Sequence, residues 1–318
     1  MTTDYVPDNP IPTDELLPLG AEALSGREIK GIERIGRGST NLVYRIKTSD
    51  GDFILKIAHR ADRIKAGILE KEVYILKMMG QYSWPVPVPT LVWFGRTRHD
   101  LPAFIENAFP GDAIDKIVNQ DTNVKEAGYK LGQFVGQLHG LTHDSIDEFE
   151  TNRRPFPDFP SYARYWMEEW RPLCESAPHI ALADIKKAYQ RIEVGLKYFQ
   201  NDRPVYVNAD LGKENLIGVV ENNKLELSGV CDFENTQTGP PEYDIATLEN
   251  YLFLDYPAFE KPFFEGYQSI RALPANFEER FVVVNLFRGL RYIKRVVKYD
   301  EKHFYDVNRR FLGKWLNK

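Results

Sequence analysis

The pattern of apolar and polar positions divides the chain into a strand-rich first part and a helical second part. Over residues 29–58, apolar and β-branched residues alternate with polar ones, which predicts three antiparallel strands. Asp50-Gly51 is the strongest hairpin signal in this stretch. Residues 62–80 have a helical period, and 90–96 and 102–109 read as two further strands.

The second part begins near Gly111. Apolar residues between Val124 and Leu141 recur at three and four positions, as expected for an amphipathic helix. Residues 144–203 start with a loop rich in proline and phenylalanine and continue as helices. Residues 205–233 read as two short β segments around an Asn222-Asn223 turn, and the chain beyond Glu242 is mostly helical.

These elements and the length of 318 residues favour an α+β fold with two lobes. We predict an N-terminal arm (1–26), a small antiparallel-sheet lobe (27–108) and a larger, mostly helical lobe (109–318). The arm is acidic and rich in proline, and residues 7–18 are expected to pack poorly.

Composition narrows the function classes. The net charge is −5 and no basic stretch stands out, so no nucleic-acid partner is expected. No window approaches 18 uncharged apolar residues, and the N-terminus lacks the pattern of a signal peptide. With only two cysteines, a disulfide framework is not expected. We therefore expect a cytoplasmic protein without a membrane contact, either a monomer or a homodimer.

Two charged residues stand at apolar positions. Lys56 lies in the middle of an apolar strand, where it either faces solvent or meets an anion. Glu72 falls in the middle of the apolar face of helix 62–80, whereas Glu70 falls on its polar side. A carboxylate that faces the core needs a cation, so Lys56 is the natural partner of Glu72. The alternative for Glu72 is a position at the edge of the helix.

The first predicted hairpin contains Gly36, Gly38 and Ser39 in the stretch IGRGSTN. Such a loop offers backbone N–H groups and hydroxyls to phosphate oxygens. It is also a common structural turn, and it lacks the G-x-x-x-x-G-K-[ST] pattern of a P-loop.

The stretch VNADLGKENLI interrupts an apolar run with Asp210 and, five residues later, Asn215. The following hairpin is expected to bring Asn215 close to Asp232. One carboxylate and one amide oxygen, together with phosphates, suit Mg²⁺, and Asp210 is then left to accept a proton from a hydroxyl. Each residue alone could be a turn former. With Lys56 and Glu72, however, their order is that of a protein-kinase phosphoryl-transfer site.

These motifs resemble the aminoglycoside phosphotransferase and choline kinase-type family over about residues 30–260. Its members carry H-G-D-x-x-x-x-N, then D-[FW]-[ED], then G-[DP]-P-x-x-D-[LI]-A. The corresponding residues here are Asn208-Ala209-Asp210 with Asn215, Asp232-Phe233-Glu234 and GPPEYDIATL. The resemblance implies a bilobal protein kinase-like fold, with a nucleotide-binding lobe over 27–108 and a catalytic and substrate-binding lobe over 109–318. It also implies a small-molecule kinase that uses ATP (or GTP) and Mg²⁺, because only ten positions separate Glu234 from Asp244 and leave no room for a long activation loop.

The resemblance also implies residue roles. Asp210 is the expected catalytic base, and Asn215 and Asp232 are the expected magnesium ligands. Asp244 is expected to order the catalytic loop, and Asn208 stands where the family has a supporting histidine. For the nucleotide, the implied contacts are Lys56 held by Glu72, the loop with Gly36, Gly38 and Ser39, and the backbone of 105–108, which includes Glu106 and Ala108.

The acceptor is the least defined partner. Tyr162, Trp166 and Trp170 are four residues apart, so one helical face carries three rings. The resemblance makes this region a substrate wall, although the rings could equally pack the larger lobe. If Trp166, Trp170, Glu169 and Glu234 line the cleft with Glu168, a cationic amino-sugar or choline-like acceptor is expected. The principal prediction is an aminoglycoside-like hydroxyl acceptor. The alternatives are a choline, homoserine or methylthio-sugar kinase and a nucleotide-binding pseudokinase.

Overall fold

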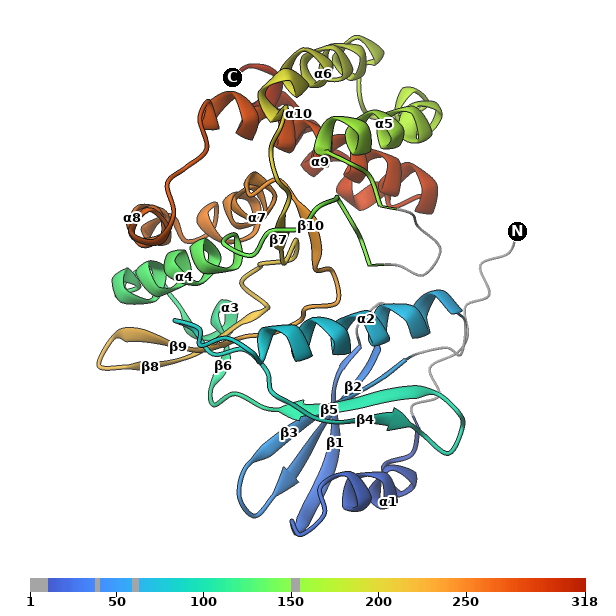
Figure 1. Ribbon diagram of the computed structural model, residues 1–318, viewed down its shortest axis with the longest axis vertical. Helices are drawn as coiled ribbons and strands as arrows, with labels where there is room; N and C mark the ends of the chain where they lie inside the picture. Colours follow the sequence, from blue (N-terminus) through green and yellow to red (C-terminus); the bar gives the residue numbers. More distant parts are fainter. Residues whose placement is uncertain (1–10, 38–40, 59–62, 150–154) are drawn as a thin grey trace. The chain divides into compact units, whose positions relative to one another are not determined.

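The computed structural model describes residues 11–37, 41–58, 63–149 and 155–318 (Figure 1). The chain forms two compact units. The first contains Met1–Val118, Glu214–Glu221 and Glu226–Glu234, and the second contains Asn119–Lys213, Asn222–Leu225 and Asn235–Lys318. The predicted α+β class is confirmed, because an antiparallel sheet dominates the first unit and helices dominate the second.

The first unit is built on a five-stranded antiparallel sheet. Its strands are β1 (Ile29–Arg37), β2 (Asn41–Thr48), β3 (Asp52–Ala58), β4 (Leu91–Arg96) and β5 (Pro102–Asn107), in the order β1-β2-β3-β5-β4. Gly51 turns the chain between β2 and β3 with φ of 135°, a conformation that a residue with a Cβ rarely adopts. The predicted hairpin at Asp50-Gly51 is therefore confirmed.

Two helices pack on this sheet (Figure 1). Helix α1 (Thr13–Ala23) packs against β1, and α2 (Arg63–Met79) packs against β3, β4 and β5. Side chains alternate between the two faces of a strand. On β3, Leu55 and Ile57 join the buried cluster that includes Leu16 of α1. Lys56 therefore points to the opposite face.

The expectation that residues 7–18 pack poorly is wrong for residues 11–18, the part that the structure describes. Ile11, Leu16 and Leu24 are all buried in the core that covers one face of the sheet. Asp14 and Glu15 lie in the first turn of α1, where negative charge stabilises a helix. Because one face of the sheet exposes apolar side chains, even a short proline-containing helix gains stability by covering it.

A second, three-stranded sheet follows the first. It consists of β6 (Asp112–Ala113), β8 (Leu216–Glu221) and β9 (Lys224–Val230), and the short helix α3 (Ile114–Ile117) follows β6. Asn222 and Asn223 join β8 to β9 with φ of 50° and 61°. Two successive positive φ values are typical of a type I′ hairpin turn. The Asn222-Asn223 turn predicted from the sequence is thus confirmed.

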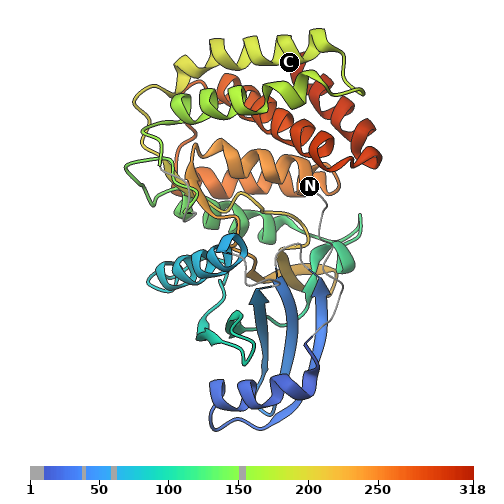
Figure 2. The same cartoon turned by 90° about the vertical axis from the view of Figure 1, so that its right-hand side faces the viewer.

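The second unit is mostly helical (Figure 2). Its helices are α4 (Lys125–Leu138), α5 (Phe159–Glu175), α6 (Leu182–Gly195), α7 (Glu242–Leu248), α8 (Glu260–Ile270), α9 (Phe277–Tyr299) and α10 (Tyr305–Leu316). A π-helical segment, Glu249–Phe253, continues α7, and short 3₁₀ turns occur at Leu196–Phe199, Pro257–Phe259 and Lys302–Phe304. Strands β7 (Val205–Val207) and β10 (Gln237–Gly239) pair antiparallel.

Two packing features organise these helices. Helix α9 packs against α5, α6, α7 and α10. Helix α4 approaches α8 so closely that a Cβ on Gly132 would lie 2.0 Å from the carbonyl oxygen of Phe263. Only glycine fits at this position. Within the described parts of the chain, no helix is both long enough and apolar enough to cross a membrane.

Candidate active site

Lys56 lies at the centre of a cluster of acidic side chains in the first unit. Its Nζ lies 2.6 Å from Glu72 Oε1, 3.3 Å from Asp232 Oδ1 and 4.0 Å from Glu106 Oε1. Burial alone would lower the pKa of Lys56, but Glu72, Asp232 and Glu106 outweigh this effect and raise it well above its usual value. Lys56 is therefore positively charged at neutral pH. The Lys56–Glu72 pairing predicted from the sequence is confirmed.

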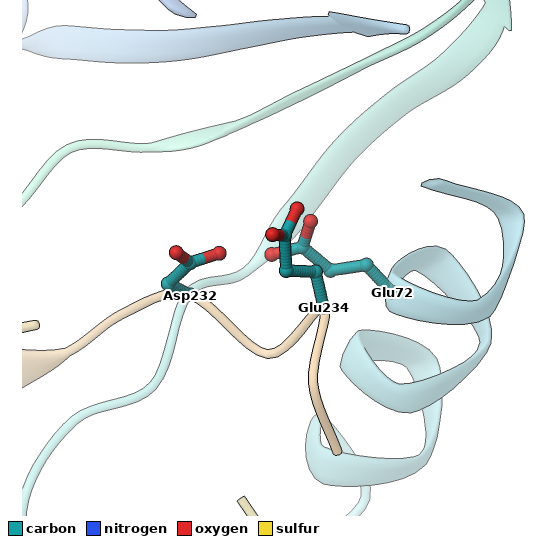
Figure 3. Close-up of side chains that lie close together, drawn as sticks. All are labelled: Glu72, Asp232 and Glu234. Atoms are coloured by element: carbon teal, nitrogen blue, oxygen red, sulfur yellow. The ribbon is translucent and has the colours of Figure 1, made fainter. Parts of the chain in front are cut away.

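Three carboxylates gather beside this ammonium group. Figure 3 shows Glu72 on α2 together with Asp232 and Glu234, which lie on the loop after β9. One oxygen atom from each lies within 4.8 Å of the others. The Phe233 N–H donates to Glu72 Oε1 at 3.2 Å, and Asn41 Nδ2 donates to Glu234 Oε2 at 2.9 Å. The carboxylates are thus held together by the chain, and such an oxygen set suits a divalent cation.

The hairpin of β8 and β9 positions two sequence-predicted residues. The N–H of Cys231 donates to the carbonyl oxygen of Asn215 at 2.9 Å, so the chain at Asn215 lies beside the residue that precedes Asp232. Asp232 itself has φ of 64°, an uncommon conformation for a residue with a side chain. The expected approach of Asn215 to the Asp232 segment is therefore present in the backbone. Their roles as metal ligands stay a prediction.

Glu106 contributes a side chain that the sequence analysis did not anticipate. Only its backbone was expected to matter, as part of an adenine contact. In the sheet, Lys56 of β3 pairs with Phe104 of β5, and Glu106 lies two residues after Phe104 on β5. Alternation along a strand puts Phe104 and Glu106 on one face. That Glu106 faces Lys56 follows from the pairing register of β3 and β5, which cannot be read from the sequence alone.

Among the residues expected to contact the nucleotide, the structure describes Ala108 and Gly36 but not the rest of the glycine loop. The N–H of Ala108 donates to the carbonyl oxygen of Asp52 at 3.0 Å, so this N–H is already engaged. Gly36 lies in β1 and pairs with Val43. Gly38 and Ser39 lie outside the described residues.

The second unit contains the loop with Asp210. Asp244 is fully buried, and its carboxylate accepts the N–H groups of Asn208 and Ala209 at 3.0 and 2.7 Å. His139 Nε2 lies 3.1 Å from the same carboxylate. Ala209 has φ of 63°, a strained conformation for alanine. Asp244 therefore orders this loop, as predicted.

Side chains on both sides of Asp210 hold it in place. Its N–H donates to Asn208 Oδ1 at 3.0 Å, which is the supporting contact expected of the residue that replaces the family histidine. Asn235 Nδ2 donates to Asp210 Oδ2 at 3.1 Å. Asn235 was missed, although it directly follows the recognised Asp-Phe-Glu motif. This carboxylate is oriented by the chain, as a proton acceptor requires.

The aromatic residues of α5 mainly pack within the second unit. Trp170 is 5% exposed and lies against Phe287 of α9 with ring centroids 5.0 Å apart. Trp166 is half-buried and stacks on Trp170 at 5.6 Å, while Glu169 is exposed. The packing alternative therefore accounts for Trp170. A substrate contact by Trp166 or Glu169 stays a prediction, and Glu234 belongs to the carboxylate cluster described above.

The cluster around Lys56 predicts a pH effect on stability. Burial raises the pKa of Glu106 to about 8, although Lys56 opposes the rise and the carboxylates of Glu72 and Asp232 add to it. The unfolded chain releases this proton near pH 4.5, so the native state binds more protons between these two values. Stability should therefore fall as pH rises through this window.

We expect Glu106→Gln to remove the part of this dependence that belongs to Glu106. Relative to the unmodified protein, its free energy of unfolding should increase by about 2–4 kcal/mol between pH 5 and pH 9. Urea unfolding in metal-free buffer at both pH values measures the difference. Glu33→Gln, at an exposed carboxylate on β1 that pairs with Lys47, is the matched control. Equal pH slopes for Glu106→Gln and the unmodified protein would contradict the raised pKa.

Comparison with known proteins identifies the family. Residues 31–279 match the phosphotransferase enzyme family (APH). The chain therefore belongs to this family and is a phosphotransferase of the small-molecule kinase type. It is 26% identical to a homoserine kinase of Gluconobacter oxydans over 273 residues, which cover 80% of this chain and 77% of the relative. It is 21% identical to a probable ketoamine kinase of Vibrio cholerae over 294 residues, which cover 90% and 92%.

Solved structures share the fold. A thermostable mutant of aminoglycoside phosphotransferase APH(4)-Ia, in ternary complex with ADP and hygromycin B, has a TM-score of 0.69 at 13% identity, covering 94% of this chain and 96% of that one. The GDP complex of aminoglycoside 2′-phosphotransferase-IIIa has a TM-score of 0.68 at 14% identity, covering 96% and 99%. The protein kinase-like fold expected from the sequence is thereby confirmed.

Proposed function

We propose that this chain transfers the γ-phosphoryl group of ATP or GTP to a hydroxyl of a small-molecule acceptor. The observation that carries the proposal is the contact of Lys56 with both Glu72 and Asp232, at 2.6 and 3.3 Å. Lys56 and Asp232 are 176 positions apart in the sequence. A lysine held between a helix glutamate and a loop aspartate is the arrangement that phosphoryl-transfer sites use to bind a metal nucleotide.

The carboxylate cluster fits a magnesium ion. Asp232 and Glu234 supply oxygen atoms close to one another, and Asn215 lies on the adjoining strand end. These three residues would hold Mg²⁺, whereas Glu72 is engaged by Lys56. When bound, the ion offsets negative charge on the phosphate oxygens.

The remaining roles belong to this chain's own side chains. Lys56 donates to the phosphate oxygens, and Glu72 keeps its ammonium group in place. The acceptor oxygen attacks the γ-phosphorus while the bond to the bridging oxygen of the diphosphate breaks. Asp210 orients the hydroxyl and takes its proton. Asn235 donates to its carboxylate, and Asn208 accepts its backbone N–H. Catalysis then rests on positioning and electrostatics without a covalent intermediate on the chain.

Nucleotide titrations test this function. By calorimetry we expect ADP to bind in the presence of Mg²⁺ and to bind at least about tenfold more weakly to Asp232→Asn. Glu226→Gln is the matched control, because Glu226 is exposed and lies on β9, the strand that precedes Asp232. ADP release is then followed with kanamycin, hygromycin B, L-homoserine, choline and a ketoamine. Absence of any magnesium-dependent nucleotide binding contradicts the proposal, and binding without turnover on any acceptor supports a pseudokinase instead.

A further inference from the structure

Side-chain contacts join the chain after α7 to α9 on one hand and to the Asp210 loop on the other. Tyr251, on the π-helical segment Glu249–Phe253, donates its hydroxyl to the Tyr292 hydroxyl of α9 at 2.8 Å. Arg288 Nη2 donates to the same Tyr292 oxygen at 3.0 Å. Lys213, three residues after Asp210, forms an ion pair with Asp255, just past that segment. The π-helical segment therefore lies beside the catalytic loop.

Electrostatics support this proximity. Burial raises the pKa of Tyr251, and Tyr292 and the charge of Asp210 raise it further, against the opposing charge of Arg288. The Asp210 carboxylate is thus close enough to influence the Tyr251 hydroxyl. π-Helical segments within α-helices are frequent at functional sites.

Tyr251 and Tyr292 also line a cavity of about 400 Å³. Its size is within the usual range for small-molecule sites. Several of its apolar lining residues are unusually exposed: Leu254 is 70%, Val307 49%, Phe304 40% and Tyr251 38% exposed. The cavity therefore offers an apolar surface to a ligand.

The charged residues of the lining are mainly basic. Arg295, Arg310 and Lys314 line the cavity, and Glu301 is the one acidic lining residue in the described chain. Glu301 lies 3.5 Å from Arg295, and Lys314 is paired with Glu249. Arg310 has no carboxylate within ion-pair distance among the described residues. A molecule with several positive charges would meet like charge here, which disfavours its binding.

We propose that this cavity is the acceptor pocket and that it selects a hydroxyl compound with an apolar or aromatic body and no net positive charge. A carboxylate on the acceptor is favoured by Arg310. This inference rests on the proposed function, because the acceptor hydroxyl must reach Asp210. It departs from the cationic amino-sugar expected from the aromatic residues of α5.

Binding of two contrasting probes tests the pocket. Ligand-observed NMR is recorded with 4-(hydroxymethyl)benzoate and with kanamycin, each in the presence of saturating ADP and Mg²⁺. We expect the benzoate to bind and kanamycin to bind at least about tenfold more weakly. Arg310→Glu and Val307→Asp should each weaken benzoate binding by about tenfold or more. Val194→Asp, at a 60% exposed valine on α6, is the matched control and should leave it unchanged.

The outcomes separate this inference from the proposed function. Magnesium-dependent ADP binding that is equal in all variants shows that they are folded and keep the nucleotide site. If ADP binds but the benzoate does not, or if kanamycin binds better and is insensitive to Arg310→Glu, the pocket assignment is overturned. If sedimentation shows a dimer that Val307→Asp dissociates, the cavity is an interface between copies and the assignment is likewise overturned. If ADP itself does not bind, the proposed function fails first.

Discussion

Replacing Asp210 by asparagine is expected to lower acceptor-dependent ADP formation by about 10²–10⁴-fold, the usual contribution of a positioned general base. The change keeps the size of the side chain and an oxygen that can still accept from Asn235 Nδ2, which lies 3.1 Å from Asp210 Oδ2. The loop should keep its shape, because Asp244 holds it through the N–H groups of Asn208 and Ala209. Asparagine cannot take a proton from the acceptor, so the loss should appear in kcat and not in nucleotide affinity.

A coupled ADP assay and calorimetry with ADP and Mg²⁺ measure the two quantities on the same preparation. Glu214→Gln, at an exposed carboxylate four residues further along the loop, should change neither by more than about twofold. Turnover by Asp210→Asn within threefold of the unmodified protein would show that another group accepts the proton.

Lys56→Met is expected to have the second large effect, on both activity and stability. It removes the ammonium group that lies 2.6 Å from Glu72, a glutamate whose side chain is fully buried. A buried carboxylate that loses its partner typically costs about 3–5 kcal/mol. Nucleotide binding with Mg²⁺ should also weaken, because Lys56 is the residue proposed to donate to the phosphate oxygens.

A double-mutant cycle separates the two effects. Adding Glu72→Gln to Lys56→Met removes the unpaired charge, so urea unfolding should show recovery of much of the lost stability, whereas turnover should stay low. Lys47→Met is the control, because Lys47 makes an exposed pair with Glu33 that should contribute less than about 1 kcal/mol. A double variant as unstable as Lys56→Met alone would falsify the role given to the Glu72 charge.

The sequence was most informative where a charged residue occupied an apolar position. Lys56 and Glu72 each conflict with their local pattern, and the conflict is resolved only if they meet, so their contact was predictable. Hairpins were equally accessible, because Asp50-Gly51 and Asn222-Asn223 have the backbone preferences that tight turns require. Both the ion pair and the turns were predictable because each depends on the properties of a few residues and their immediate neighbours.

Features that depend on long-range packing could not be predicted from the sequence. Helix α1 packs because one sheet face needs cover, which cannot be inferred from a proline-rich segment alone. The engagement of the Ala108 N–H by Asp52 depends on sheet register. The cavity near Tyr251 depends on how α9 and α10 meet, which no local pattern in the sequence indicates. Three-residue strands such as β10 carry too short a pattern to recognise.

The backbone at Ala209 limits which residues this position can tolerate. Its φ of 63° places the Cβ in a conformation that costs an alanine roughly 1–2 kcal/mol, and a β-branched residue more. Glycine would adopt the same backbone without that cost. Natural variation at position 209 should therefore be confined to the smallest side chains, even though no substrate needs to touch it.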